Sequence, residues 1–310
     1  LPWEWMLIVA PAAGFGFGMI ESIVGALIIE MYKDAKASAM SKLETFFGIG
    51  ALIIPLAAAF LIRNHIWEWS FPMLTAISGI TLLLWLCLSF GKDIDDQLSR
   101  PTKAQRQEAG VRLKYTSRAL PFLIISMAFF FLYVGTEMSF SNYLPSILIE
   151  RTTLSESSAA GMLSLFWGFM VIGRMFCGIL ADRYGYIRYL AISMVGAVIA
   201  FIGIALFEGT TAILIMIALS GLSFSGVFGI GLVYVNSCIS GMTERTTSLL
   251  VACGGIGGAL FPRLTGWVMD KYMVSATLAL IACIVAIMLI CMVAMMLVGR
   301  NHDLQKVKSS

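Results

Sequence analysis

The sequence predicts an all-α membrane protein whose chain crosses the bilayer several times. Apolar residues make up 59% of the 310 residues, charged residues only 13%, and the mean hydropathy is +0.89. An ordinary globular domain is about 45–50% apolar and about 25% charged. The expected solvent for most of this surface is therefore lipid rather than water.

Nine runs of mainly apolar residues are long enough to cross a membrane, which takes about 20 residues per helix. A turn is expected near Gly209 and Thr210, at the start of the seventh run. The nine runs lie at about 5–31, 42–62, 68–90, 120–149, 158–181, 189–207, 211–238, 246–268 and 273–299.

The basic residues between these runs predict the orientation of the chain. Most of the 21 Lys and Arg residues fall in alternate loops and in the C-terminal tail, whereas only Arg63, Arg151 and Lys271 fall in the other loops. Because Lys and Arg are retained in cytoplasmic loops, the C-terminus is predicted to be cytoplasmic. The expected location is the cell (inner) membrane, which the chain crosses many times.

One long polar stretch divides the chain. Residues 91–118 are the expected cytoplasmic linker between the halves, with three helices in 1–90 and six in 119–310. Many transporters have two six-helix halves, each a pair of inverted three-helix repeats. We therefore expect helices four to twelve of twelve, with 1–90 the remainder of the N-terminal half. The alternative is a protein that natively has nine helices.

Charge and cysteine usage exclude several classes of partner. A net charge of +3, with most basic residues between the apolar runs rather than in a stripe, gives no surface for nucleic acid. The six cysteines lie inside apolar runs without a CxxC pair or a nearby histidine, so they are expected to be small buried side chains. No metal or other cofactor is expected, and the predicted partners are the lipid bilayer and a small molecule bound by a monomer.

The strongest local pattern is the segment 173–188, at the expected cytoplasmic end of the fifth run. Gly178 allows a close approach of helices. Asp182 and Arg183 lie where a helix reaches water and can pair, and Gly185 permits a tight turn into the next helix.

This segment resembles the loop motif of the major facilitator superfamily, G-x-L-x-D-R-x-G-R-[KR], with Tyr186 where the family usually has Arg. The resemblance implies the major facilitator fold. It also implies a conformational latch on the cytoplasmic face that takes no part in substrate binding. The residues assigned to this latch are Arg174, Gly178, Asp182, Arg183 and Gly185.

Three further segments resemble the fucose-permease branch of that superfamily, and within it the bacterial glucose/mannose:proton symporters. They are residues 14–21, 40–51 and 132–147. The resemblance implies secondary active transport, with proton-coupled uptake of a neutral hexose by alternating access. A proton and a sugar would then be the small-molecule partners.

Glu21 lies near the middle of the first run, where an ionised side chain costs a few kcal/mol or more. Carboxylates inside the membrane are functional by default, and the resemblance implies that Glu21 carries the coupled proton. The alternative is an acid that packs by hydrogen bonding to a neighbouring helix.

Glu137 also lies near mid-span, in a run that Pro145 should bend near Ser141. Bent helices at this depth are where transporters bind substrate. Glu137 and Asn142 would bond sugar hydroxyls, and aromatic faces would contact the ring, although packing or an interfacial position is the more usual role of an aromatic in a span. These aromatics are Tyr133, Phe140, Tyr143 and Trp167.

Two further features leave alternatives open. Glu44 is a candidate substrate ligand or a charge reaching toward the cytoplasm. The glycine run 254–258 lies inside a span without a following Lys and Ser or Thr, so it predicts close helix packing rather than a phosphate loop.

Other functions fit the sequence less well. A membrane-embedded enzyme would need a nucleophile with a base or paired aspartates at one depth, and His65 and His302 lie in a loop and in the tail. A proton-driven drug exporter of the same fold is the main alternative. It would favour an apolar cavity, whereas Glu137, Ser139 and Asn142 predict a polar one. A receptor or scaffold without transport activity is the third reading.

Overall fold

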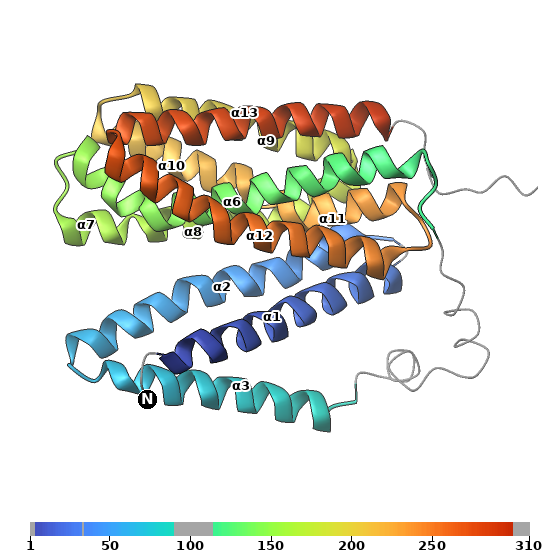
Figure 1. Cartoon of the computed structure of the whole chain (residues 1–310), viewed down its shortest axis with the longest axis horizontal. Coiled ribbons are helices and arrows are strands. Elements are labelled where there is room, and N and C mark those ends of the chain that lie inside the picture. Colours follow the sequence, from blue (N-terminus) through green and yellow to red (C-terminus); the bar gives the residue numbers. More distant parts are fainter. Residues whose placement is uncertain (1–3, 33, 90–113, 300–310) are drawn as a thin grey trace, which may run out of the picture. The chain divides into compact units, whose positions relative to one another are not determined.

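The computed structural model describes residues 4–32, 34–89 and 114–299, and the regular structure in these ranges is entirely helical (Figure 1). Nine segments of this described part are long and apolar enough to cross a membrane, which confirms the predicted spans. The elements are α1 (Glu4–Met31), α2 (Lys36–Arg63), the 3-10 turn η1 (Trp67–Trp69), α3 (Ser70–Cys87), α6 (Ala119–Arg151), α7 (Glu156–Gly161), α8 (Leu163–Tyr184), α9 (Tyr186–Leu206), α10 (Thr210–Phe224), α11 (Val227–Cys238), α12 (Thr243–Lys271) and α13 (Val274–Val298).

The seventh predicted span is interrupted, which the sequence analysis did not foresee. α10 ends at Phe224 and α11 begins at Val227. The hydroxyl of Ser225 donates back to the carbonyl of Leu222 at 2.7 Å, and Gly226 follows. A serine that bonds its own backbone and a glycine both weaken a helix. The break therefore has a local cause and exposes the backbone at mid-span.

The residue contacts divide the chain into two compact units, Leu1–Ile49 with Tyr115–Ser310 and Gly50–Lys114. The smaller unit holds the second part of α2, η1 and α3, where the rings of Trp67 and Phe71 meet edge to face at 6.3 Å. The predicted linker lies mostly in residues 90–113, outside the described part. The division at 91–118 therefore stays a prediction.

In the larger unit α6 packs against both α12 and α13 (Figure 1). α9 packs against α10 and α13, α8 packs against α10, and α1 packs along α12. The six spans from α6 to α13 thus form one bundle, and α1 and the first part of α2 contact it.

Glycines make the α6–α12 contact close. A side chain at Gly257 would collide with the backbone carbonyl of Phe131, and a Cβ at Gly254 would lie 2.8 Å from Val134. This confirms close packing for Gly254 and Gly257 of the run 254–258, whereas Gly255 has open space beside it. Small residues at a helix interface are the usual means of close packing in membranes.

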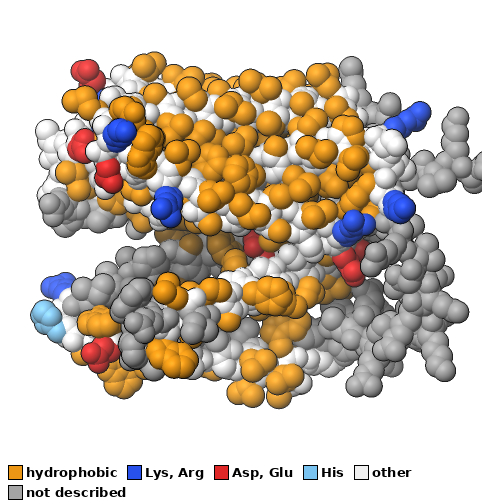
Figure 2. All heavy atoms as spheres, viewed as in Figure 1, with side chains coloured by type: hydrophobic (Ala, Val, Ile, Leu, Met, Phe, Trp, Pro, Cys, Tyr) orange, Lys and Arg blue, Asp and Glu red, His pale blue; other side chains and the backbone are white. Residues whose placement is uncertain are grey.

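The outside of the bundle is apolar. On the face drawn in Figure 2, hydrophobic side chains cover the side of the six-span bundle, and the charged ones gather toward its ends. Ile192, Leu206 and Ile290 are examples of large hydrophobic side chains that are exposed. Such a surface suits contact with lipid, which agrees with the predicted class of membrane protein.

Candidate functional site

A cavity of about 410 Å³ lies within the larger unit, between α1, α2, α6, α8, α11 and α12. Its size is in the range of small-molecule sites, about 300–1,000 Å³. Most of its lining is apolar. Its charged groups are Glu21 of α1, Glu44 of α2, Glu137 of α6 and Arg174 of α8. The three carboxylates, each a candidate from the sequence, come from three different helices, and the fold brings them to one site.

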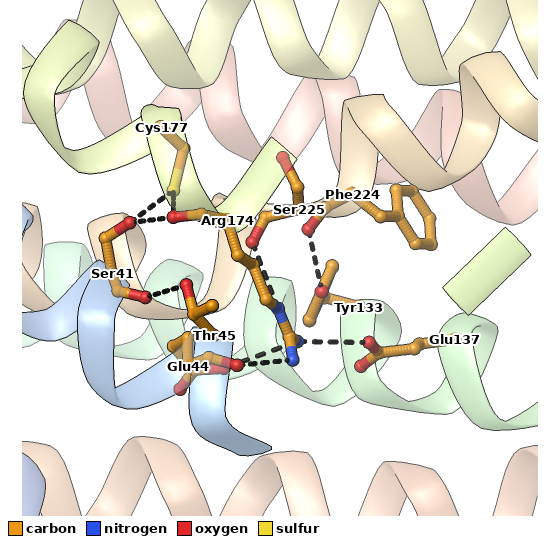
Figure 3. A network of polar contacts seen from close by, with 9 residues as sticks. All are labelled: Ser41, Glu44, Thr45, Tyr133, Glu137, Arg174, Cys177, Phe224 and Ser225. Carbon is orange, nitrogen blue, oxygen red and sulfur yellow. Dashed lines mark hydrogen bonds and ion pairs between the residues drawn. The ribbon is translucent and has the colours of Figure 1, made fainter. Parts of the chain in front are cut away.

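Arg174 is the cation of this cavity, and its side chain is 2% exposed. Its Nη2 lies 3.3 Å from Glu44 Oε2 and 3.8 Å from Glu137 Oε1 (Figure 3). Nη1 donates to the carbonyl of Glu44 at 3.1 Å, and Nε donates to the carbonyl of Ser225 at 3.3 Å. The guanidinium therefore joins α2, α6 and the break between α10 and α11.

These contacts explain why a buried Arg is tolerated. A guanidinium has five N–H donors and no acceptor, so it needs several oxygens when it leaves water. The carbonyl of Ser225 lies in the helix break, and the two carboxylates supply charge. The ring of Phe47, 5.5 Å from the guanidinium carbon, covers one side of the group.

Glu137 is less completely satisfied than Glu44. Its side chain is 7% exposed, and Oε1 has no hydrogen-bond partner among the described residues. The distance of 3.8 Å to Arg174 is too long for a hydrogen bond. Glu137 therefore lines the cavity with a carboxylate that is not fully hydrogen-bonded.

Glu21 is half-buried at the same cavity, on the α1 side. Both ion pairs of Arg174 in the described part go to other carboxylates, Glu44 and Glu137. In total three carboxylates share a cavity with one guanidinium. Such an excess of acid in an apolar enclosure favours binding of a cation or of protons.

The loop-motif residues lie where α8 meets the start of α2. Asp182 accepts hydrogen bonds from the amides of Ala37 and Ser38 at 3.2 and 2.9 Å and from the hydroxyl of Ser38 at 2.6 Å. Its carboxylate thus caps the first turn of α2, where free amides and the helix dipole favour an anion. This contact was missed in the sequence, because it joins residues 144 positions apart.

Close packing supports the same contact. A side chain on Gly178 would collide with the backbone of Ala37 and Ser38. Ser41 of α2 donates its hydroxyl to the carbonyl of Arg174 and accepts from the amide of Gly178 at 3.3 Å. The expected close approach at Gly178 is therefore present, and its partner is α2.

Two other motif residues lie at the turn into α9. Gly185 has a φ of +95°, a conformation that favours glycine, as expected for a tight turn. Arg183 is exposed and lies over the ring of Tyr184, 5.4 Å from its centroid. Arg174 was assigned to the same motif but reaches into the cavity instead.

Five predicted substrate ligands do not line this cavity. Asn142 is exposed, and Tyr143 approaches Gly266 of α12.

The other three aromatics pack inside the bundle. Phe140 packs edge to face between Phe166 and Phe201, and Trp167 packs against Phe166. Tyr133 packs on Phe224 and donates to its carbonyl at 3.1 Å. In this structure these aromatics serve helix packing, the alternative that the sequence left open.

Comparisons with known proteins agree with this architecture. Glucose/mannose transporter GlcP of Bacillus subtilis is 29% identical over 284 residues, covering 90% of this chain and 69% of that protein. Sodium-dependent glucose transporter 1A of Mus musculus is 23% identical over 296 residues, covering 86% of this chain and 69% of that protein. The chain therefore spans about two thirds of the length of these relatives.

Two crystal structures of FucP, the E. coli fucose:proton symporter, share the fold, with TM-scores of 0.70 and 0.68 at 17% and 18% identity. They match 90% of this chain and 73% and 74% of the FucP chains. The sequence profile of the Major Facilitator Superfamily matches residues 2–262. With its spans, its loop motif and this match over most of its length, the chain belongs to the major facilitator superfamily.

Proposed function

We propose that the protein is a secondary active transporter that takes up a neutral hexose together with a proton. The observation that carries the proposal is Glu137, a carboxylate that lines the cavity and whose buried Oε1 has no hydrogen bond from the described residues. A sugar hydroxyl would supply that bond. The names of GlcP and FucP, which give glucose, mannose and fucose as substrates, support the sugar class.

The proton is proposed to bind at Glu21. A neutral sugar brings no charge, so a group on the protein must take up the coupled proton. Glu21 suits this role because both ion pairs of Arg174 go to other carboxylates. Desolvation in the membrane disfavours the charged form of such a group. FucP is named a fucose:proton symporter, which supports coupling to protons in this fold.

A drug exporter of the same fold is the alternative that the sequence analysis kept. The apolar lining of the cavity suits it, and Asn142, which had predicted a polar cavity, lies elsewhere. The sugar reading is favoured because the four charged groups converge in one place and the relatives are named for sugars. Uptake of labelled glucose against efflux of a lipophilic cation, measured in the same vesicles, distinguishes the two.

Glu137→Gln tests the sugar contact. Hydrogen bonds to charged groups contribute about 1.5–3 kcal/mol, so the dissociation constant for D-glucose should rise by about 10- to 150-fold. Titration calorimetry of the purified complete protein measures this change. Glu150→Gln, an exposed carboxylate at the end of the same helix, is the control and should leave affinity unchanged. Equal affinity for wild type and Glu137→Gln would refute the assignment.

Asp182→Asn tests the contact between α8 and α2. The amide would retain a neutral acceptor and lose the charge that favours the start of α2, an effect of about 0.3–1 kcal/mol. We expect transport rates to change by several-fold while the equilibrium affinity for glucose stays the same, because Asp182 does not line the cavity. Asp270→Asn, exposed at the end of α12, is the control. Large, equal losses of affinity and rate would show that the contact belongs to the binding site.

A further inference from the structure

One nitrogen of Arg174 faces two carboxylates that belong to different helices. Nη2 is 3.3 Å from Glu44 on α2 and 3.8 Å from Glu137 on α6. We propose that Arg174 is the coupling residue of transport: occupancy of the cavity at Glu137 decides how strongly Arg174 holds Glu44, and thereby how firmly α8 holds α2. This inference rests on the proposed binding of a hexose at Glu137.

The other two nitrogens fix the position of the guanidinium. Nε is bonded to the carbonyl of Ser225, and Nη1 to the carbonyl of Glu44. Only Nη2 lies between the carboxylates, so its pairing changes when the charge of either carboxylate is compensated. Of the two distances, the one to Glu44 is the shorter, so Glu44 is the carboxylate that holds this nitrogen more closely.

The two carboxylates compete because they share one cation in an apolar surrounding. Attraction between charges is much stronger there than in water. A sugar hydroxyl that donates to Glu137 satisfies part of its charge and weakens its attraction for Arg174. The guanidinium is then left to Glu44, and the ion pair between α8 and α2 becomes stronger.

The strengthened pair acts on a contact that is already built. Ser41 of α2 donates its hydroxyl to the carbonyl of Arg174. It also lies 3.2 Å from the thiol of Cys177, which is about one turn beyond Arg174 on α8. One turn further, Asp182 caps α2. The ion pair and the cap therefore hold the same two helices at successive levels. An interaction in the cavity can in this way change the stability of the whole contact.

Cys177 offers a native probe of this contact. Its side chain is 2% exposed and lies against Ser41, so movement of α2 away from α8 should make it accessible to a maleimide. The other five cysteines are replaced by alanine or serine: Cys87, Cys238, Cys253, Cys283 and Cys291. The rate of labelling by N-ethylmaleimide, followed by intact mass, then reports how often the contact opens.

The experiment compares labelling of the complete protein with and without saturating D-glucose. Couplings between sites are typically 5- to 150-fold, so glucose should slow labelling of Cys177 by at least about fivefold. In Glu44→Gln, labelling without glucose should be faster and the effect of glucose should disappear. Because coupling between sites is reciprocal, glucose affinity should fall in this variant, so labelling is measured at a glucose concentration that saturates each variant. Arg174→Lys, which keeps the charge but not the planar fork, should also lose the effect of glucose.

Each result decides a separate point. Glucose that binds wild type without slowing the labelling overturns this inference and leaves the proposed function intact. Equal slowing in wild type, Glu44→Gln and Arg174→Lys overturns it as well, because coupling would then bypass the ion pair. If calorimetry finds no glucose binding to wild type, the proposed function fails, and this inference fails with it.

Discussion

Replacing Glu21 with Gln is expected to abolish concentrative uptake of hexose and to leave exchange of hexose down its own gradient intact. Gln resembles the protonated carboxyl in shape and charge but cannot release a proton. The variant should therefore move between its outward and inward states in every condition, with or without a proton gradient. The expected loss is complete for accumulation and small for exchange.

Vesicles with an imposed pH gradient measure this separation. Accumulation of labelled glucose should fall to the level of vesicles without protein. The rate of counterflow should remain within about threefold of wild type, which corresponds to less than about 1 kcal/mol in free energy. Glu30→Gln, an exposed carboxylate at the end of the same helix, is the matched control and should accumulate glucose normally. A Glu21→Gln carrier that still concentrates sugar would remove Glu21 from the coupling mechanism.

Replacing Arg174 with Gln should have the largest effect on stability. Breaking a buried ion pair by removing one partner costs about 3–5 kcal/mol, because a charge is left buried without compensation. Here two carboxylates lose their cation and two carbonyls lose a donor. The apparent melting temperature in detergent should fall by several degrees or more, and little folded protein should be recovered.

A second substitution separates charge from packing. The double variant Arg174→Gln with Glu44→Gln removes one charge of each sign and should recover part of the lost stability. Arg188→Gln, exposed near the start of α9, is the control for loss of a positive charge. If the double variant is less stable than Arg174→Gln alone, the uncompensated charge of Glu44 is not what destabilises the single variant.

The spans could be predicted from sequence because the bilayer imposes one requirement on every helix. Length and hydropathy locate all nine, and the turn at Gly209 and the packing glycines at 254–258 follow from local chemistry. The break at Ser225 could not be predicted from the sequence, because serine and glycine are also common in unbroken membrane helices. Its partner, Arg174, lies on another helix.

The site was predicted in part for a related reason. A carboxylate inside a membrane span is rare whichever way its side chain points. Glu21, Glu44 and Glu137 could therefore be identified without knowledge of their neighbours. The direction of the other candidates depends on helix geometry. Asn142 is five residues from Glu137, which turns it about 140° around the helix, and it is exposed. Arg174 was grouped with its sequence neighbours although its side chain reaches the cavity.

The bond between Arg174 and the carbonyl of Ser225 also bears on how the chain enters the bilayer. A lone Arg at the centre of a helix raises the free energy of insertion by about 2.5–3.5 kcal/mol on translocon scales. Backbone groups freed by a helix break are poorly tolerated in lipid unless a neighbour satisfies them. In the finished fold each of these groups satisfies the other. We therefore expect α8 to wait beside the translocon until α10 and α11 have been synthesised, so that the two spans partition into lipid together.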